Sequence, residues 1–372
     1  MKLAILGYGV VGKGVEKIAE ENGIEVSYIL MRDIDELYKA NMTKDLDEII
    51  GDRELDCVVE CIGGDEPAHS YVLKALKAGK HVVSSNKKML VKHFRELNEV
   101  ARDEGVTLLF SAACGGGIPW LREVAAIADE EEISSFKGIM NGTSNYILDR
   151  MYKEGLDFAT ALKNAQELGY AEADPSDDID GIDTANKVIL SAGIAFNSCF
   201  RLEDVFIRGI RKLDIADLDY ARDHGLKIVL LGKGKRDGGR YALSVMPAFV
   251  RKDSVLGNIA DNYNCFILNS ANLSDLVFIG QGAGSLPTAS NVIRDILSLT
   301  DPYTVRLDSD ETSDYSRKST YYIRTAKSVK EEYIKERISD KAFITRPLSI
   351  DTLRSLTDEE GFVGEMENDQ GM

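Results

Sequence analysis

The stretch Gly7-Tyr8-Gly9-Val10-Val11-Gly12 decides how the N-terminal part of this 372-residue chain folds. It follows the strand-like run Lys2-Leu3-Ala4-Ile5-Leu6 and opens a helix-like stretch at residues 10–19. In such a turn the first glycine bends the chain, the second lets the backbone approach a pyrophosphate, and the third lets the helix pack on the strand. The helix N-terminus offers N–H groups and a partial positive charge to the phosphates. We therefore predict that all six residues contact a dinucleotide cofactor.

A second strand is expected at residues 25–31, and the residues after it bear on which dinucleotide binds. A carboxylate at this place bonds the ribose hydroxyls of NAD, whereas an arginine accommodates the 2′-phosphate of NADP. Arg32 is the first polar residue after the strand, and Asp33 follows it. Arg32 therefore favours NADP, Asp33 leaves NAD open, and an exposed turn with neither role explains the pair equally well.

Composition and charge narrow the class of protein. The chain is long enough for two or three domains, with 44% hydrophobic and 29% charged residues. Its net charge of −17 argues against nucleic acid or an anionic membrane as a partner. No apolar run approaches the length of a membrane span, and the N-terminus is a core strand rather than a signal peptide. We expect a cytoplasmic protein that binds a small molecule.

Cysteine and histidine usage supports this location. The five cysteines are odd in number, and neither they nor the four histidines show metal-ligand spacing. We therefore expect a reducing compartment, no structural zinc and no histidine cluster. The residues concerned are Cys57, Cys61, Cys114, Cys199, Cys265, His69, His81, His93 and His224.

Strand and helix signals alternate up to about residue 130. Repeated βα units with apolar strands predict an α/β fold with a doubly wound, Rossmann-type parallel sheet over residues 1–132, completed by a helix within residues 285–302. The turns that follow its strands face the ligand crevice. After residue 132 the pattern changes to longer strands, which predicts an α+β catalytic and dimerisation domain at residues 133–284. Residues 303–372 form a short C-terminal appendage.

The second domain contains the strongest candidate for chemistry, an acidic stretch at residues 167–188. Asp183 and Lys187 are four residues apart on a predicted helix and therefore share a face, with Glu172 on the preceding loop. A lysine held by carboxylates can hand a proton to a carbonyl oxygen. The alternative is an exposed ion pair worth about 0.3–0.5 kcal/mol. The acidic loop and the shared chain with a cofactor fold favour the catalytic interpretation.

With these segments the chain resembles the homoserine dehydrogenases. The resemblance covers residues 1–300 and implies reversible, NAD(P)H-dependent reduction of L-aspartate 4-semialdehyde to L-homoserine, in threonine and methionine biosynthesis. The segments that carry it, in family order, are Gly7 to Gly12, Gly63-Gly64-Asp65-Glu66-Pro67-Ala68, Val83-Ser84-Ser85-Asn86-Lys87-Lys88, Gly115-Gly116-Gly117-Ile118-Pro119, Asn141-Gly142-Thr143-Ser144-Asn145-Tyr146, residues 169–187 and Gly280-Gln281-Gly282-Ala283-Gly284.

The resemblance also implies roles for single residues. Lys187 matches the proposed proton donor of the family, and Lys87 matches a second lysine near cofactor and substrate. Which of the two lysines donates the proton stays open. Glu172 and Asp183 match carboxylates that hold the substrate, and charge-assisted hydrogen bonds suit its α-ammonium group. Asn141 to Asn145 is interpreted as site architecture. The implied cofactor contacts are Gly63, Ser85, Lys87, Gly169 and Gly282.

Family members can also bind a sodium ion through backbone carbonyls, here those of Ser111, Cys114, Gly116 and Ile118. Ser111 stands where Glu is frequent and Cys114 where Val is frequent, but carbonyl ligation does not depend on the side chain. A catalytic role for Cys114 is disfavoured, because no histidine accompanies it in the nearby sequence. This also argues against an aspartate-semialdehyde dehydrogenase, which needs a thiol nucleophile with a base.

The remaining expectations concern the C-terminal residues 303–372 and the oligomeric state. Tyr321-Tyr322-Ile323-Arg324 resembles the first strand of the ACT domain that some members append, but the turn and helix expected next are missing, so a degenerate ACT-like appendage is predicted. The resemblance implies a homodimer, which we expect to be built from residues 133–285. The alternative to an enzyme is a catalytically inactive, nucleotide-sensing relative, and the joint presence of Lys187, Asp183 and Glu172 argues against it.

Overall fold

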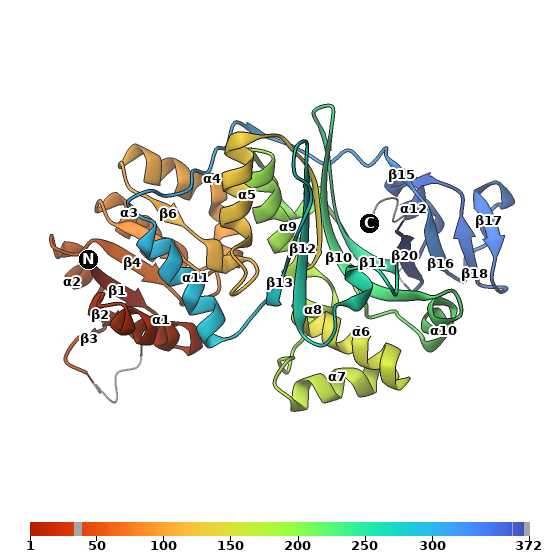
Figure 1. The fold of residues 1–372 in the computed structure, drawn as a ribbon, viewed down its shortest axis with the longest axis horizontal. Helices are drawn as coiled ribbons and strands as arrows, with labels where there is room; N and C mark the ends of the chain where they lie inside the picture. Colours follow the sequence, from red (N-terminus) through yellow and green to blue (C-terminus); the bar gives the residue numbers. More distant parts are fainter. Residues whose placement is uncertain (33–38, 359, 368–372) are drawn as a thin grey trace. The chain divides into compact units, whose positions relative to one another are not determined.

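The computed structural model describes residues 1–32, 39–358 and 360–367 (Figure 1). These divide into two compact units. Unit 1 comprises residues 1–132, 190–201 and 280–310, and unit 2 comprises residues 133–189, 202–279 and 311–372. Among the described residues, no helix combines the length and the apolar character that crossing a membrane requires.

Unit 1 is built on a parallel sheet with the strand order β3-β2-β1-β4-β5-β6. This is the doubly wound order, so the predicted fold class is confirmed. The elements of this unit are β1 (Lys2–Leu6), α1 (Val10–Glu21), β2 (Glu25–Leu30), β3 (Met42–Thr43), α2 (Leu46–Gly51), β4 (Cys57–Glu60), α3 (Ala68–Lys77), β5 (His81–Ser84), α4 (Lys87–Asp103), β6 (Leu108–Leu109), η1 (Ser111–Ala113), α5 (Trp120–Glu130), β8 (Ser198–Cys199), α11 (Ser285–Leu297) and β14 (Ser309–Asp310).

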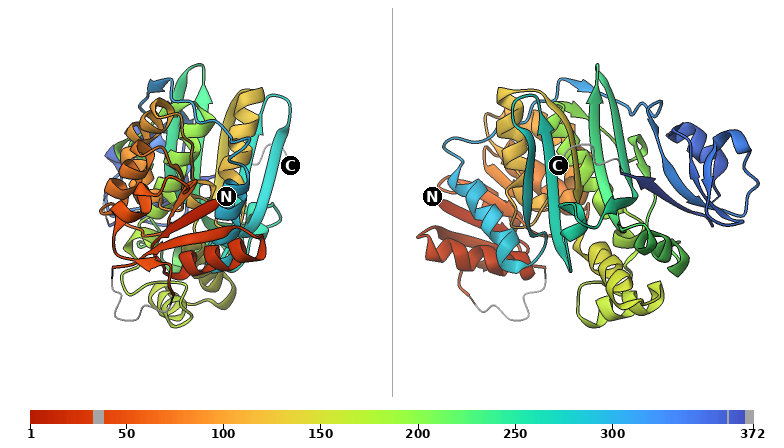
Figure 2. Two further views of the ribbon diagram at one scale, coloured as in Figure 1. Left: turned by 90° about the vertical axis from the view of Figure 1, so that its left-hand side faces the viewer. Right: turned by 45° about the vertical axis from the view of Figure 1, so that its right-hand side comes forward.

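The late helix α11 belongs to unit 1 and contributes Ala289, Val292 and Ile296 to its core. It lies beside α1 (Figures 1 and 2). A Cβ atom on Gly14 of α1 would lie 2.8 Å from Ser285 Oγ and 3.0 Å from Ala289 Cβ. Only glycine therefore allows the two helices to approach this closely. Both helices pack on one apolar core with the strands, which includes Leu3, Val15 and Val292.

Unit 2 is built on a mixed sheet with the order β13-β12-β7-β10-β11-β20-β16-β18-β17, and β9 pairs with β11. Helix α9 (Ile182–Ala195) begins in this unit and ends in unit 1. The other elements are β7 (Ile133–Ile139), α6 (Gly142–Glu154), α7 (Phe158–Glu167), α8 (Ser176–Ile179), η2 (Leu202–Asp204), β9 (Val205–Ile207), α10 (Ile215–Asp223), β10 (Leu226–Asp237), β11 (Arg240–Arg251), η3 (Leu256–Asn258), β12 (Tyr263–Ser270), β13 (Ser274–Gln281), β15 (Lys318–Ser319), β16 (Tyr321–Arg324), η4 (Glu331–Tyr333), β17 (Ile334–Arg337), β18 (Ala342–Thr345), β19 (Leu348–Ser349), α12 (Ile350–Leu356) and β20 (Phe362–Met366).

One glycine and one buried ion pair fix helices of unit 2 on this sheet. A Cβ atom on Gly232 of β10 would lie 2.7 Å from Val188 Cγ2 and 2.9 Å from Thr184 Cγ2, so α9 rests directly on the strand. Lys227 Nζ of β10 lies 3.1 Å from Asp149 Oδ1 of α6, and both side chains are buried. Hydrogen bonds and charges around Asp149 outweigh its burial and lower its pKa to about 2.

The C-terminal strands extend this sheet. β20 pairs in parallel with β11 through Ala248 and Glu365, and β16 lies antiparallel between β20 and β18. Where the sequence lacks the first helix of an ACT domain, the structure has only the short 3₁₀ turn η4 between β16 and β17. Tyr322 and Phe362 pack against Phe249 of β11, so these strands share a core with the main sheet.

Candidate functional site

The glycine turn of unit 1 has the geometry that a dinucleotide requires. Gly7 adopts φ +93°, and a Cβ on it would lie 2.9 Å from the Cys61 carbonyl oxygen. A Cβ on Gly12 would lie 2.2 Å from the Gly7 carbonyl oxygen. Gly9, in contrast, has no atom within 4 Å of the place where its Cβ would lie. The first and third glycines therefore serve the fold, and the space over Gly9 is open for a ligand.

A hollow of about 470 Å³ opens at this turn within unit 1. Arg32 lines this hollow, and Asp33 falls outside the described residues. Lys44, directly after β3, lines the same hollow, which the sequence reasoning missed because β3 has only two residues. Two cations on one wall suit a phosphate group. The hollow is lined by Gly7, Tyr8, Gly9, Leu30, Met31, Arg32, Lys44, Cys61, Ile62, Pro67 and Tyr71.

The buried carboxylate of Glu60 at the end of β4 holds the two neighbouring turns. It accepts hydrogen bonds from the Ile62 and Gly63 backbone N–H groups at 2.7 and 3.3 Å. Its other oxygen accepts one from Ser84 Oγ at 2.5 Å. Burial raises its pKa, against the effect of these hydrogen bonds. Glu60 thus positions the predicted cofactor residue Gly63 and the strand end before Ser85.

Lys87 and Ser85 lie at the start of α4 in the same unit. Both are half-buried. Asn86 caps the helix by accepting from Met89 N at 3.3 Å, and its amide donates to the Gly64 carbonyl oxygen at 2.7 Å. Lys87 is therefore the first residue of a helix whose start is tied to the Gly63-Gly64 turn.

In unit 2 the predicted lysine–aspartate pair forms inside the protein. Lys187 Nζ lies 2.8 Å from Asp183 Oδ2 and donates to the Met140 carbonyl oxygen at 2.5 Å. The two side chains are 9% and 10% exposed. Such burial excludes the exposed surface pair that the sequence left as an alternative. Main-chain and side-chain contacts together fix the direction of the ammonium group.

Asn141 connects this pair to a second carboxylate. Its Nδ2 donates to Asp183 Oδ2 at 2.8 Å and to Asp178 Oδ1 at 2.6 Å, and its Oδ1 caps α6 by accepting from Ser144 N at 2.8 Å. Burial raises the pKa of the Asp178 carboxyl, and the nearby Asp183 raises it further. The sequence reasoning saw Asn141 as architecture and gave Asp178 no role. The only feature of the sequence that could have pointed to Asp178 is its position in the acidic stretch at residues 167–188.

Glu172 and Gly169 lie on the loop that follows α7. Both are exposed, and Gly169 has φ +76°. The loop is fastened by Gln166 Nε2, which donates to the Glu172 carbonyl oxygen at 3.1 Å, and by Thr143 Oγ1, which donates to the Tyr170 carbonyl oxygen at 2.6 Å. The first predicted substrate carboxylate is thus solvent-accessible, while the second, Asp183, is buried.

Comparison with known proteins decides the family. Residues 7–111 match the family model "Homoserine dehydrogenase, NAD binding domain", and residues 119–297 match the model "Homoserine dehydrogenase". A homoserine dehydrogenase from Synechocystis is 38% identical over 316 residues, 80% of this chain and 73% of the relative. The chain belongs to the homoserine dehydrogenase family. The homologue from Bacillus subtilis is 33% identical over 314 residues, 80% of this chain and 72% of its own.

Solved structures of the family agree over nearly the whole chain. A homoserine dehydrogenase from Thiobacillus denitrificans superposes with a TM-score of 0.90 at 28% identity, covering 99% of this chain and 98% of its own. That from Staphylococcus aureus at pH 8.5 gives a TM-score of 0.78 at 31% identity, with 99% of both chains covered. As a homoserine dehydrogenase, the chain is an NAD(P)-dependent oxidoreductase that interconverts L-homoserine and L-aspartate 4-semialdehyde, on the route to threonine and methionine.

Three of the four carbonyl oxygens implied for sodium, those of Ser111, Gly116 and Ile118, already accept hydrogen bonds. Asn291 Nδ2 donates to the carbonyl oxygens of both Gly116 and Ile118, at 2.8 Å for the latter. The Ile118 oxygen also accepts from Trp120 N at 2.8 Å, so both of its lone pairs are used. The Ser111 oxygen accepts from Cys114 N at 3.4 Å. As they lie, these residues do not fit a cation.

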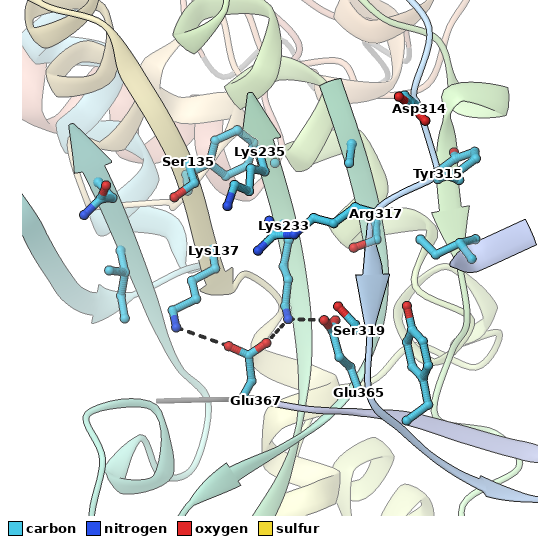
Figure 3. A pocket seen from close by; sticks show the side chains of 18 of the residues that line it. Ser135, Lys137, Lys233, Lys235, Asp314, Tyr315, Arg317, Ser319, Glu365 and Glu367 are labelled. Carbon is cyan, nitrogen blue, oxygen red and sulfur yellow. Dashed lines mark hydrogen bonds and ion pairs between the residues drawn. The ribbon is translucent and has the colours of Figure 1, made fainter. Parts of the chain in front are cut away.

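A second hollow, of about 420 Å³, lies in unit 2 between the sheet and the C-terminal strands (Figure 3). Two of its lysines are paired within the protein: Lys233 with Glu365 and Glu367, and Lys137 with Glu367. Burial raises the pKa of Glu365, but Lys233 outweighs this and the net pKa is lowered. None of the predicted catalytic residues lines this hollow.

One sequence expectation about the histidines is wrong. His69 of α3 and His93 of α4 are 24 positions apart in the chain, yet their rings stack with centroids 3.6 Å apart. Glu96 lies against both. Sequence spacing gave no sign of this cluster, because it depends on how two separate helices pack.

We predict that alanine at Gly9 and at Gly12 will have different effects. Gly9→Ala should leave the thermal unfolding temperature near that of the parent, because its Cβ meets nothing, but it should raise the NADPH dissociation constant at least tenfold by blocking the backbone approach. Gly12→Ala should destabilise the protein by about 1–3 kcal/mol, because its Cβ overlaps the Gly7 oxygen. Fluorescence titration and thermal unfolding measure both. Unchanged NADPH affinity in Gly9→Ala would contradict the binding site.

Proposed function

We propose that Lys187 donates the proton to the aldehyde oxygen when aspartate 4-semialdehyde is reduced. The single observation that supports this most is the buried Nζ held by Asp183 Oδ2 at 2.8 Å and the Met140 carbonyl oxygen at 2.5 Å. A proton donor must be positioned before the reaction, and two fixed acceptors do this for an otherwise flexible side chain. The bound nicotinamide supplies the hydride, which is the chemistry of the cofactor.

We propose that Asp178 joins Glu172 and Asp183 in binding the α-ammonium group of the substrate. Burial raises the pKa of Asp178 because it destabilises the charged carboxylate. The positive charge of a bound ammonium group would stabilise that carboxylate. Because Asn141 bonds Asp178 and Asp183 at once, the two carboxylates keep a fixed separation.

Lys87 receives a supporting role in this proposal. It starts α4, next to the Asn86 cap that is bonded to the Gly64 carbonyl oxygen. This places it by the turns that follow β4 and β5, where parallel sheets bind ligands. We assign Lys87 to holding cofactor and substrate, and Lys187 to proton transfer.

For the cofactor we propose NADP, held by the predicted residues Gly7 to Gly12, Gly63, Ser85, Gly169 and Gly282. Arg32 and Lys44 support this choice, because both line the hollow at the glycine turn and are exposed. A sodium ion receives no step in the mechanism, because the Ile118 oxygen would first have to give up a hydrogen bond.

The domain roles and the location follow the same reasoning. We propose that residues 1–132 with 285–302 bind the cofactor, that residues 133–284 bind substrate, and that residues 303–372 form an ACT-like module without its first helix. The order β20-β16-β18-β17 of four antiparallel strands supports the last assignment. A cytoplasmic location fits the bacterial relatives and the five cysteines, which form no disulfide.

We also propose a homodimer that forms through the sheet of unit 2. Strand β13 is the edge of that sheet and is eight residues long. Apolar side chains near it are exposed, with Leu273 at 43% and Ile279 at 53%. A long apolar edge strand invites pairing with another chain. The net charge of −17 opposes association, but cellular salt screens charges beyond about 8 Å.

The catalytic proposal predicts that Lys187→Met lowers kcat about 10²–10⁴-fold, the range for losing a positioned acid, with NADPH affinity unchanged. Lys163→Met is the matched control, because Lys163 forms an exposed i,i+4 pair with Glu167 at 3.8 Å and should keep full activity. Glu172→Gln should mainly raise KM for the semialdehyde. Steady-state NADPH oxidation measures all three. An unaltered kcat in Lys187→Met would transfer the role to Lys87 or to water.

For the cofactor, Arg32→Gln should reduce kcat/KM with NADPH about 10–100-fold relative to NADH, the value of a lost charge-assisted hydrogen bond. Arg53→Gln, an exposed arginine that does not line the hollow, should leave the ratio unchanged. The measurement is the ratio of the two specificity constants. Equal ratios in Arg32→Gln and the parent would contradict the NADP proposal.

For the assembly, light scattering should give twice the chain mass of 41.0 kDa. Ile279→Lys should shift the protein toward the monomer, because it places a charge on the proposed interface. Leu202→Lys alters another exposed apolar residue of unit 2, 38% exposed, and should leave the dimer intact. A monomeric parent would refute the dimer, and equal behaviour of the two variants would move the interface away from β13.

A further inference from the structure

The hollow of about 420 Å³ in unit 2 has a floor of regularly placed side chains. The strand register sets these side chains in two rows, each of which runs across β12, β7, β10 and β11 in that order. Alternate residues of a strand point to the same face, so both rows lie on one face of the sheet, and all of their members line the hollow. The rows are Asn269-Ser135-Lys235-Ala242 and Ile267-Lys137-Lys233-Ser244.

The C-terminal segment forms another wall of the same hollow (Figure 3). From this wall Glu365 and Glu367 pair with Lys233, and Glu367 also pairs with Lys137, so both lysines of the second row have partners. The side chain of Arg317 points from the wall toward the lysines of β10 (Figure 3). The first row, in contrast, has Lys235 as its only charged member.

The pairing of charges leaves two cations over. Four cationic and four carboxylate side chains line the hollow. Besides the two glutamates, Asp314 pairs at 3.3 Å with an arginine outside the lining, and Asp275 accepts a hydrogen bond of 2.8 Å from a side-chain amide. Among the described residues, Lys235 and Arg317 form no ion pair with a carboxylate.

The two cations also act against each other. Burial lowers the pKa of Lys235, and the charge of Arg317 lowers it further. Asp237, two residues along the same strand, offsets only part of this effect, because the net pKa is lowered. The arrangement therefore costs free energy in the protein alone, and an anion bound between the two cations would recover it.

We propose that Lys235 and Arg317, with the hydroxyl of Ser135, bind a phosphate or carboxylate group of a small molecule in this hollow. A guanidinium presents a planar fork of donors that matches the oxygens of either group, and an ammonium adds a compact charge. Ser135 lies directly opposite Lys235 and can donate its hydroxyl hydrogen. On the other side of Lys235, the small side chain of Ala242 leaves room for the ligand.

Size and position agree with a separate binding site. The volume of the hollow lies within the range of about 300–1,000 Å³ that small-molecule sites occupy. Helix α9 packs at Gly232 on the opposite face of β10, so the ligand would lie away from the proposed proton donor. It would join Arg317, directly before β15, to the strands β7 and β10. A ligand that binds only the folded protein also stabilises it by mass action.

The test uses the full chain with saturating NADPH, which occupies the nucleotide site. Calorimetric titrations with inorganic phosphate and with succinate, at matched ionic strength, probe the two kinds of group. At least one anion should bind saturably in the millimolar range or tighter, with one site per chain, and should raise the thermal unfolding temperature. Lys235→Met and Arg317→Gln should each weaken this binding about tenfold or more, while NADPH oxidation stays near the parent rate.

The stability of the variant without an anion gives a second readout. Lys235→Met should unfold at a temperature no lower than that of the parent, because it removes a half-buried cation that Arg317 repels. A lysine with a purely structural role would lower the unfolding temperature when replaced. A clearly lower value would therefore contradict the proposal.

Lys335→Met is the matched control, because Lys335 is an exposed strand lysine of unit 2 that does not line the hollow. It should bind the anion as the parent does. Binding of phosphate, of succinate or of both would support the site, and the tighter anion indicates the group that the ligand carries. Three results would overturn the proposal: no saturable binding of either anion, parental affinity in Lys235→Met and Arg317→Gln, or equal loss in Lys335→Met. Loss in Arg32→Gln alone would also overturn it, because the anion would then lie in the nucleotide hollow.

Discussion

The side-chain amide of Asn141 is the contact on which the candidate catalytic site depends. An amide has one acceptor oxygen and two donor hydrogens. Here the oxygen caps α6 at Ser144 N, and the nitrogen donates to both Asp178 and Asp183. Asp183 in turn holds Lys187. The side chain of Asn141 therefore connects the start of α6, the short helix α8 and the face of α9 that carries Asp183 and Lys187. A buried network of this kind is stable only when each member is paired, which is why it fixes a single geometry.

In unit 1, as in unit 2, one buried polar side chain bonds several segments of the chain. The buried Glu60 carboxylate gathers the backbone of Ile62 and Gly63 and the hydroxyl of Ser84. Burying a carboxylate is costly, as its raised pKa indicates, and the hydrogen bonds repay that cost only in the observed arrangement of the turns. In each unit, therefore, a polar group inside the protein determines where functional loops begin. Apolar packing holds the helices against the sheets, and the buried Glu60 and Asn141 side chains determine where the residues of the candidate sites lie.

Contacts between residues close together in the sequence could be predicted, whereas contacts between distant segments could not. The glycine turn and the Asp183–Lys187 pair were predictable because their residues are neighbours on one turn or one helix face. Lys44 was missed because β3 has only two residues. Glu60 and Asp178 were missed because Ser84 and Asn141, which bond them, come from other elements. His69 and His93 show the same limit, since no spacing rule connects residues on two packed helices. Tyr321 to Arg324 was recognisable as a strand, but pairing of β20 with β11 was not, because pairing is set by the fold.

The pairing of β20 with β11 changes how the C-terminal strands should be understood. Their apolar cluster includes Phe206 and Met246 from the main part of unit 2, so they do not bury a core of their own. Asp217 of α10 binds Arg324 through two hydrogen bonds of 2.9 Å and accepts a third from Tyr322 Oη, also at 2.9 Å. At the other face Lys233 of β10 pairs with Glu365 of β20. Removing these strands would expose the edge of β11 at Ala248 and Phe249 and would leave the half-buried Lys233 without Glu365. It would also leave the buried Asp217 without Arg324, and breaking a buried pair costs about 3–5 kcal/mol. The C-terminal segment is thus bound into the sheet on which α9 rests, and it is a part of unit 2 rather than a separately folded appendage.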